Sequence, residues 1–228
     1  MSTIIQRIPR KQVNREKWNL AVNGERFPSP YGLCWWLDAV TDSNWEGLVL
    51  GDYQLVLPIP FFLKVGPLAL VNGASFTQHL GPFGEGSSEE KQALLGQVSS
   101  LRYVRKLSSL VMAPGNRFKI TPRNNYELEL LPGYGTISKG YRADLRRKLR
   151  RNELPPPVKI SAESFIQFYL DTLGEKISMS SKDQRVVHAL LLADKNRAKG
   201  SVMPFGLKAR RRYWAHSFWR RTDRVSST

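Results

Sequence analysis

Two runs of strand-forming residues flank a short turn early in the chain, and no other feature constrains the fold as much. Residues 45–50 and 53–57 are rich in Trp, Leu, Val and Tyr, and Gly51-Asp52 lies between them. A glycine-containing turn between such runs is typical of a β-hairpin. Because proline cannot donate to a β-ladder, Pro58 and Pro60 predict the end of the second strand. The fold must therefore contain antiparallel strands.

Helical patterns alternate with predicted strands along the rest of the chain. The spacing of apolar residues predicts helices over 14–42 with a turn at 27–32, and over 88–106, 136–151, 163–174 and 182–198. Capping-box pairs, Ser87 with Glu90 and Ser181 with Gln184, mark two helix starts. Further strands are predicted at 107–113, 125–131 and 158–160. This order predicts an α+β fold with a mixed, mostly antiparallel sheet flanked by helices.

Composition indicates a folded protein rather than a disordered one, since 41% of the 228 residues are hydrophobic and 24% are charged. No apolar run reaches the roughly 18–20 residues that a membrane-spanning helix needs, and no apolar block follows the basic N-terminal residues. The single cysteine, Cys34, excludes an intramolecular disulfide and offers no metal cluster. We therefore expect a cytoplasmic protein with neither a metal site nor a membrane partner.

The predicted helix at 136–151 combines an apolar stripe with a dense row of cations. Ile137, Tyr141, Leu145 and Leu149 recur every four residues, which predicts one buried edge. Seven cations lie over 139–151, and Asp144 alone offsets them. Arginine forks match phosphate oxygens in paired hydrogen bonds, so a bound anion such as a pyrophosphate or an RNA backbone would explain the row. The alternative is an ordinary solvated face of an amphipathic helix.

Several strings in a fixed order resemble FemAB-like acyltransferases, a branch of the GNAT superfamily. They are Lys17-Trp18, Tyr31-Gly32 with residues 35–38, the hairpin at 47–59, Phe76-Thr77-Gln78 with Leu80-Gly81, residues 125–128 and the basic segment 141–151. The resemblance runs from about residue 5 to residue 202. It implies two GNAT-like halves, 1–131 and an incomplete 132–202, which meet at Pro132-Gly133.

The resemblance also implies an N-acyltransferase that moves an acyl or aminoacyl group to a small-molecule amine or a peptide. The donor would be an acyl-CoA such as acetyl-CoA, or an aminoacyl-tRNA. In GNAT folds the acyl carrier lies in a splay between central strands, and a helix N-terminus holds the pyrophosphate. The family's basic pattern matches here at Tyr141, Arg146, Arg147, Leu149 and Arg150, and departs from it at Ala143 and Asp144. The candidate donor-binding residues are Tyr141, Arg142, Arg146, Arg147 and Arg150.

The sequence leaves the catalytic residues undetermined. Gln78 and His79 are the only candidates, because they lie where a predicted strand meets a Gly-Pro turn, and a neutral histidine there could act as a general base. A structural role for His79 is the alternative. Trp35 and Trp36 are expected to be core and rim aromatics rather than a ligand platform.

The composition of the chain changes after residue 202, and the segment 203–228 reads like a translation in the wrong frame. It carries seven cations against Asp223, which accounts for +6 of the chain's net charge of +16. It shows neither helical nor strand periodicity. Reverse translation in the next frame from codon 213 is compatible with an apolar strand pattern, so we expect a frameshift near codon 203 and an impaired, truncated enzyme. The alternative is a genuine basic tail, and with it a non-catalytic RNA- or phosphate-binding protein.

Overall fold

The structure, a computed structural model, describes residues 4–25, 28–66, 68–101, 103–112, 118–126, 132–151, 161–173 and 179–200, with the side chains of the last segment described as far as Ala193. The predicted strand at 158–160 and the tail at 203–228 lie outside these residues. Most of the predicted strand at 125–131 does so as well.

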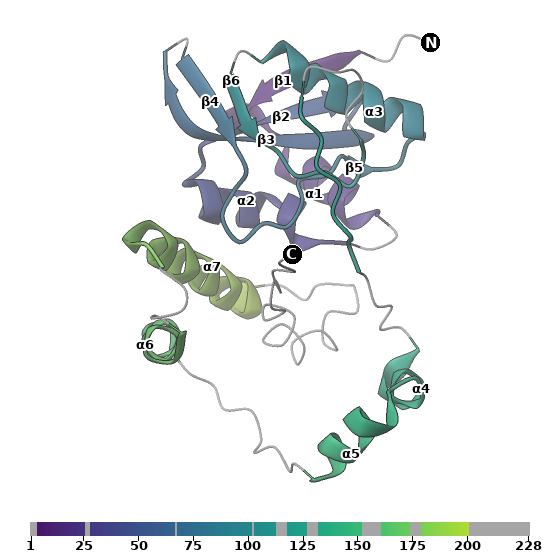
Figure 1. Cartoon of the computed structure of the whole chain (residues 1–228). Coiled ribbons are helices and arrows are strands. Elements are labelled where there is room, and N and C mark those ends of the chain that lie inside the picture. The colour runs from purple at the N-terminus through teal and green to yellow at the C-terminus, as the bar shows by residue number, and fades with distance from the viewer. Residues whose placement is uncertain are drawn as a thin grey trace, which may run out of the picture.

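One mixed sheet forms the centre of the molecule (Figure 1). Its strands are β1 (Ile5–Pro9), β2 (Trp45–Leu50), β3 (Leu55–Val65), β4 (Leu68–Asn72), β5 (Phe83–Gly84) and β6 (Tyr103–Lys106). The order across the sheet is β1-β2-β3-β4-β6, and the short β5 pairs with the start of β3. All neighbours are antiparallel except β4 and β6, which are parallel. The predicted mostly antiparallel sheet flanked by helices is therefore confirmed.

The hairpin prediction is correct, but the predicted end of its second strand is wrong, because β3 runs through Pro58 and Pro60 to Val65. The backbone N–H of Phe61 donates to Asn44 on the β2 side (3.0 Å), so by alternation the two proline nitrogens face away from β2. On that far side β5 pairs with residues 55–56 and β4 only with residues from Phe61 onward. The prolines therefore occupy the stretch of β3 where no ladder bond is needed.

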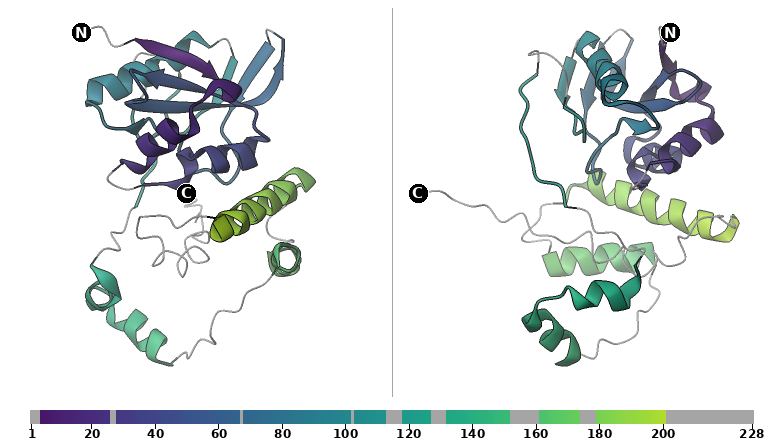
Figure 2. Two further views of the ribbon diagram at one scale, coloured as in Figure 1. Left: turned by 180° about the vertical axis from the view of Figure 1, so that it is seen from behind. Right: turned by 90° about the vertical axis from the view of Figure 1, so that its right-hand side faces the viewer.

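Helices cover both faces of the sheet (Figures 1 and 2). On one face α1 (Arg15–Asn23) and α2 (Cys34–Thr41) bury Trp18 and Leu37 against Trp45 and Val56 of the strands. On the other face α3 (Ser88–Gly96) and the following 3-10 turn η3 (Gln97–Ser100) pack on the alternate residues of β2 and β3. Short 3-10 turns η1 (Arg10–Gln12) and η2 (Pro30–Gly32) precede α1 and α2. The two-helix prediction for 14–42 is confirmed.

The prediction for 88–106 is correct at its start and wrong at its end. The capping box is present, because the Glu90 N–H donates to Ser87 Oγ (3.2 Å) and the Ser87 N–H donates to Glu90 Oε2 (2.9 Å). The helix ends at Gly96 and the chain continues as β6 over 103–106. There the pairing partner in β4, which the local sequence does not reveal, stabilises a strand instead.

The strand predicted at 107–113 is also wrong in its described part, 107–112, which has no ladder partner. Its residues instead tie down a loop, because the Leu80 N–H donates to the Ser108 carbonyl (2.9 Å) and Ser109 Oγ donates to the Gly81 carbonyl (2.6 Å). Apolar Val111 packs at the edge of the core formed with α3. Its apolar character therefore reflects burial and not strand pairing.

In the described residues after Pro132 the helices are α4 (Gly133–Lys139), α5 (Ala143–Arg151), α6 (Ala162–Leu173) and α7 (Ser181–Gly200). The predictions for 163–174 and 182–198 are close to α6 and α7. The cap of α7 lies one residue earlier than predicted, since Ser180 Oγ accepts from the Asp183 N–H (3.2 Å) and the Asp183 carboxylate accepts from Ser180. Val186 and Leu190 of α7 pack on Trp36 and Val40 of α2, which joins the predicted second unit to the first.

Candidate functional site

The basic residues are placed by two short helices rather than by the single helix predicted for 136–151. The helix is interrupted at Gly140, which follows α4 and precedes the start of α5 at Ala143. Glycine loses more backbone entropy in a helix than any other residue does. A helix therefore breaks at a glycine at little cost in free energy, unless tertiary contacts hold it straight. In Figures 1 and 2 both helices lie apart from the sheet. No residue of α5 is buried, so the predicted buried edge is wrong.

One side of α5 forms a shallow hollow lined by cations. Its lining residues are Ala143, Asp144, Arg147, Arg150 and Arg151. Three guanidinium groups thus border one concave surface, and each can offer a planar pair of donors to phosphate oxygens. The one acid present, Asp144, also pairs with Lys148 (3.3 Å). The hollow is open to solvent, as a site for a large polyanionic ligand requires.

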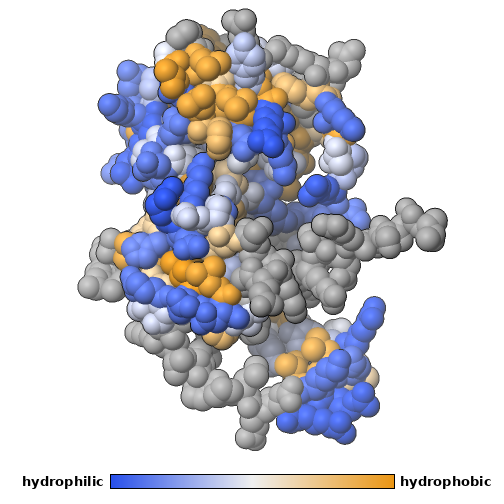
Figure 3. Space-filling model, turned by 60° about the vertical axis from the view of Figure 1, so that its left-hand side comes forward, coloured by the Kyte–Doolittle hydropathy of each residue, from blue (hydrophilic) through white to orange (hydrophobic). Residues whose placement is uncertain are grey.

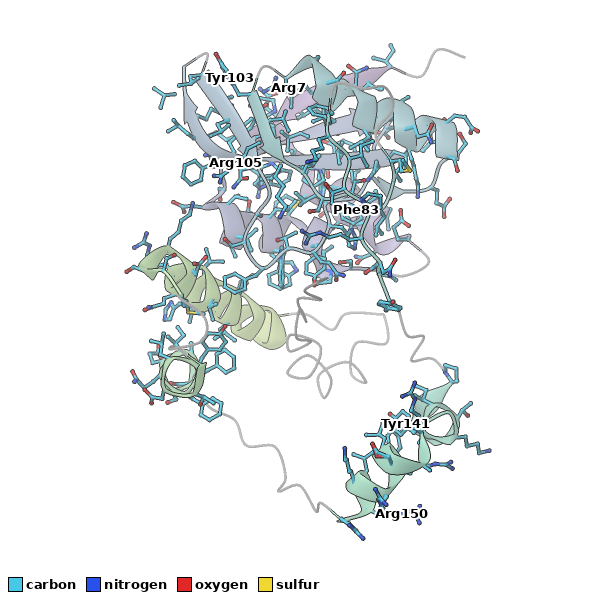
Figure 4. The ribbon with its side chains drawn as sticks, viewed as in Figure 1. Arg7, Phe83, Tyr103, Arg105, Tyr141 and Arg150 are labelled. Carbon is cyan, nitrogen blue, oxygen red and sulfur yellow. The ribbon has the colours of Figure 1, made fainter. Side chains whose placement is uncertain are left out.

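The five predicted donor-binding residues do not all meet at this hollow. Arg147 and Arg150 line it, whereas Arg142 and Arg146 do not. Tyr141 precedes α5, and its ring lies against Tyr134 of α4 with centroids 6.2 Å apart. Figure 4 shows Tyr141 and Arg150 towards opposite ends of this segment. Arg151 also lines the hollow, although it was not among the five predicted donor-binding residues. Its position four residues after Arg147 could have indicated that the two side chains share one face of the helix.

The two catalytic candidates lie elsewhere, on the loop between β4 and β5. The exposed Gln78 donates from Nε2 to Asn125 Oδ1 (2.7 Å). The ring of His79 lies edge-on to Tyr31 (centroids 5.5 Å apart, 90°) and 5.7 Å from Phe83. Figure 4 shows Phe83 on the body of the molecule, away from Arg150. The structure therefore does not bring the catalytic candidates together with the basic residues.

Trp36 is buried, as expected for a core aromatic, with 2% of its surface exposed. Its Nε1 donates to Thr77 Oγ1 (3.0 Å), and its ring contacts Tyr31 and Trp35 edge-on. Trp35 is half-buried beside it. These rings fill the space between α2, α7 and the loop before β5, so their role in packing is confirmed.

The N-terminus of α3 is not arranged to hold a pyrophosphate. Ser87 and Glu90 form the capping box already described, and Glu89 adds a second carboxylate to the first turn. Just before it, the Gly84 N–H donates to Glu25 Oε1 (2.8 Å), which also pairs with Lys91 (3.0 Å). A carboxylate thus already occupies the place of an anion at this loop, and like charges would repel a second one.

A second hollow lies between α6 and α7, and sequence reasoning did not find it. It is lined by Ile166, Ser181, Gln184, Arg185 and His188. At its edge His188 Nε2 lies 3.1 Å from Glu163 Oε1. The pKa of Glu163 is lowered to about 2 by the backbone N–H at the start of α6, with further hydrogen bonds from Ser161 and His188. Glu163 and His188 come from different helices, so no local spacing could have signalled the pair.

Metal and membrane sites were also sought in the described part of the chain. Within it, no group of three or more His, Cys, Asp or Glu side chains is placed to hold a metal ion. No helix there combines the length and the apolar character needed to cross a bilayer. In comparisons with known proteins, the chain matches no family model, no curated protein and no solved structure.

Proposed function

We propose that the chain is an acyltransferase-like protein of the GNAT type, which transfers an acyl or aminoacyl group to an amine. The order of elements in the sheet carries this proposal. Helices α1 and α2 connect β1 to β2, strands β1 to β4 are antiparallel neighbours, and the segment containing α3 returns the chain to β6 in parallel with β4. GNAT folds admit the acyl carrier in a splay between central strands, and we assign that role here to the parallel pair β4 and β6, which lies at one end of the described sheet.

The β4–β6 pair is also irregular where a splay would begin. Leu70 pairs with Tyr103 and Val71 with Val104, but Asn72 then pairs with Lys106, so Arg105 is skipped. A one-residue irregularity of this kind bends a strand and interrupts the ladder. Arg105 is exposed at this point, and Figure 4 shows it on β6 below Tyr103. A cation beside the opening would favour an anionic donor.

The phosphate groups of the donor need cations that the α3 loop does not supply. There Glu25 and the capping box already satisfy the backbone donors. We assign this role to the hollow of α5, which Arg147, Arg150 and Arg151 line, and because Figure 4 shows Arg150 far from Arg105, the assignment requires α5 to approach the sheet when the donor binds. The donor is an acyl-CoA or an aminoacyl-tRNA, since both carry phosphate groups as well as the transferable group. The remaining rate enhancement would come from positioning and from donors to the developing oxyanion.

Calorimetric titration with CoA and with inorganic phosphate tests the assignment. We expect CoA to bind more tightly than phosphate, and the double variant Arg147→Gln/Arg151→Gln to weaken CoA binding by about tenfold because two charge-assisted pairs are lost. Lys139→Gln is the matched control, since it removes an exposed cation from α4 outside the hollow. The acyltransferase assignment is rejected if CoA binds no better than phosphate.

A second candidate is a non-catalytic RNA-binding protein, and the exposure of every α5 cation on a segment apart from the sheet favours it. Such binding weakens steeply with salt, because roughly 0.7 to 0.9 counterions are released per phosphate contact. Filter binding of a structured RNA over a salt series measures that slope. Tight RNA binding together with absent CoA binding would move this candidate to first place.

A further inference from the structure

The α5 helix exposes an apolar stripe that phosphate binding does not use. Leu145 and Leu149 are 41% and 42% exposed, and their four-residue spacing places them on one face of the helix. Counted at 100° per residue, Arg147 and Arg151 lie on roughly the opposite face. The arginine hollow and the leucine stripe are therefore two separate surfaces of one helix.

Cations border the leucine stripe on both sides. By the same helical geometry, Arg146 lies at one edge of the stripe and Lys148 at the other. Residues 139–151 hold seven cations against Asp144 alone, a net charge of +6. In Figure 3 the α4–α5 segment is the lobe at the lower right, where apolar surface lies directly beside dense hydrophilic surface. The arrangement is apolar at its centre and cationic at its rim.

Two aromatic side chains lie in the same segment, on the N-terminal side of α5. Tyr134 of α4 is 55% exposed and contacts the ring of Tyr141, which precedes α5. Tyrosine rings combine an apolar body with a polar tip and are favoured where an apolar phase meets water. Their contact spans the break at Gly140 and adds aromatic surface to the segment that carries the leucines.

We propose that the α4–α5 segment binds the surface of an anionic phospholipid membrane. Leu145 and Leu149 enter the boundary between headgroups and acyl chains, while Arg146 and Lys148 contact lipid phosphates. A short basic helix with an apolar face binds membranes in this way, by apolar burial and electrostatic attraction together. An RNA backbone would satisfy the cations but leave both leucines in water. Such binding needs no spanning helix, and it is an alternative to the expectation that the protein has no membrane partner.

Co-sedimentation with lipid vesicles tests the inference with the full chain. We expect binding to vesicles of equal parts phosphatidylcholine and phosphatidylglycerol, and none to phosphatidylcholine alone. The double variant Leu145→Gln/Leu149→Gln keeps every charge and a good helix former at both positions, and should weaken binding by about tenfold or more. Leu20→Gln, which replaces a 74% exposed leucine of α1 outside this segment, is the matched control and should bind as the parent protein does. Unchanged thermal unfolding verifies that the variants are folded.

Two outcomes would overturn the inference. In the first, the parent protein and the double leucine variant bind the vesicles with equal affinity, and structured RNA displaces both of them. The segment would then bind polyanions through its charges alone. The other is the absence of binding to the anionic vesicles. CoA titration of the double leucine variant distinguishes failure of this inference from failure of the proposed function. The variant keeps every residue of the arginine hollow, so its affinity for CoA should equal that of the parent protein.

Discussion

The ion pair between Asp38 and Arg10 joins α2 to the turn that follows β1, and its removal is the sharpest test of how this fold is held together. Arg10 donates from Nε and Nη2 to the two carboxylate oxygens of Asp38, both at 2.6 Å. Trp45 Nε1 donates to the same carboxylate (2.9 Å), and the Arg10 guanidinium lies over the Trp45 ring, 5.2 Å from its centroid. One acid thus satisfies two donors that are largely buried.

Asp38→Asn should destabilise the protein by about 3 kcal/mol. Breaking a buried pair from one side costs about 3–5 kcal/mol, because the partner charge stays buried without compensation. The Arg10 and Asp38 side chains are 16% and 21% exposed, so solvent recovers part of this and the lower end applies. The amide also places an N–H₂ group against the donors of Arg10, while one oxygen remains for Trp45.

Urea unfolding, followed by tryptophan fluorescence and far-UV circular dichroism, measures this loss of stability. The urea midpoints of the variant and the parent protein are compared after verifying that the unfolding free energy has the same slope against urea concentration in both. Asp52→Asn is the matched control. Asp52 pairs with Lys17 at 2.7 Å but is 76% exposed, so its loss should cost no more than about 0.5 kcal/mol. Equal midpoints for the two variants would refute the reasoning that burial makes the Asp38 pair important.

The same pair predicts part of the acid sensitivity. Burial raises the pKa of Asp38, but hydrogen bonds from Arg10 and Trp45 outweigh it and hold the pKa below its ordinary value. The folded state therefore binds fewer protons at this carboxyl than the unfolded state does. Its stabilisation is present at neutral pH and is lost below the ordinary aspartate pKa of about 4, as the pH falls through the lower folded pKa. Asp38→Asn should flatten the stability profile in that window.

Three further predictions concern packing. Gly47→Ala should destabilise by about 2 kcal/mol, because its new methyl would lie 2.4 Å from the Trp18 ring; an unchanged urea midpoint would contradict this. Leu190→Ala should lower stability by about 2–3 kcal/mol by opening the contact between α7 and α2, whereas the 41% exposed Leu192 should tolerate alanine; similar losses at both would argue against that packing. Cys34 is fully buried, and burial raises its pKa to about 11. A chromogenic disulfide reagent should therefore label it only after the protein unfolds. Rapid labelling of the folded protein would contradict the burial of Cys34 in α2.

Local chemistry in the sequence was enough to predict several elements. Gly51-Asp52 between two β-rich runs indicated the hairpin, and Ser87 with Glu90 indicated the start of α3 through bonds that close within one turn. The helical spacing of Leu33, Trp36, Leu37 and Val40 correctly placed a buried face on α2. In each case the residues that determine the structure are neighbours in sequence. The GNAT-like arrangement stays a prediction that rests on the element order.

What only the tertiary structure decided depends on partners far away in the chain. Pro58 and Pro60 can remain within β3 because β4 and β5 leave the far side of that stretch unpaired. Residues 103–106 form a strand rather than the end of a helix because β4 offers them a ladder. The stripe of α5 stays partly exposed because none of the described elements buries it, whereas α7 is held by Trp36 and Val40 of α2. Periodicity shows which face of an element is apolar, but the surface that covers it is set by the arrangement of the whole chain.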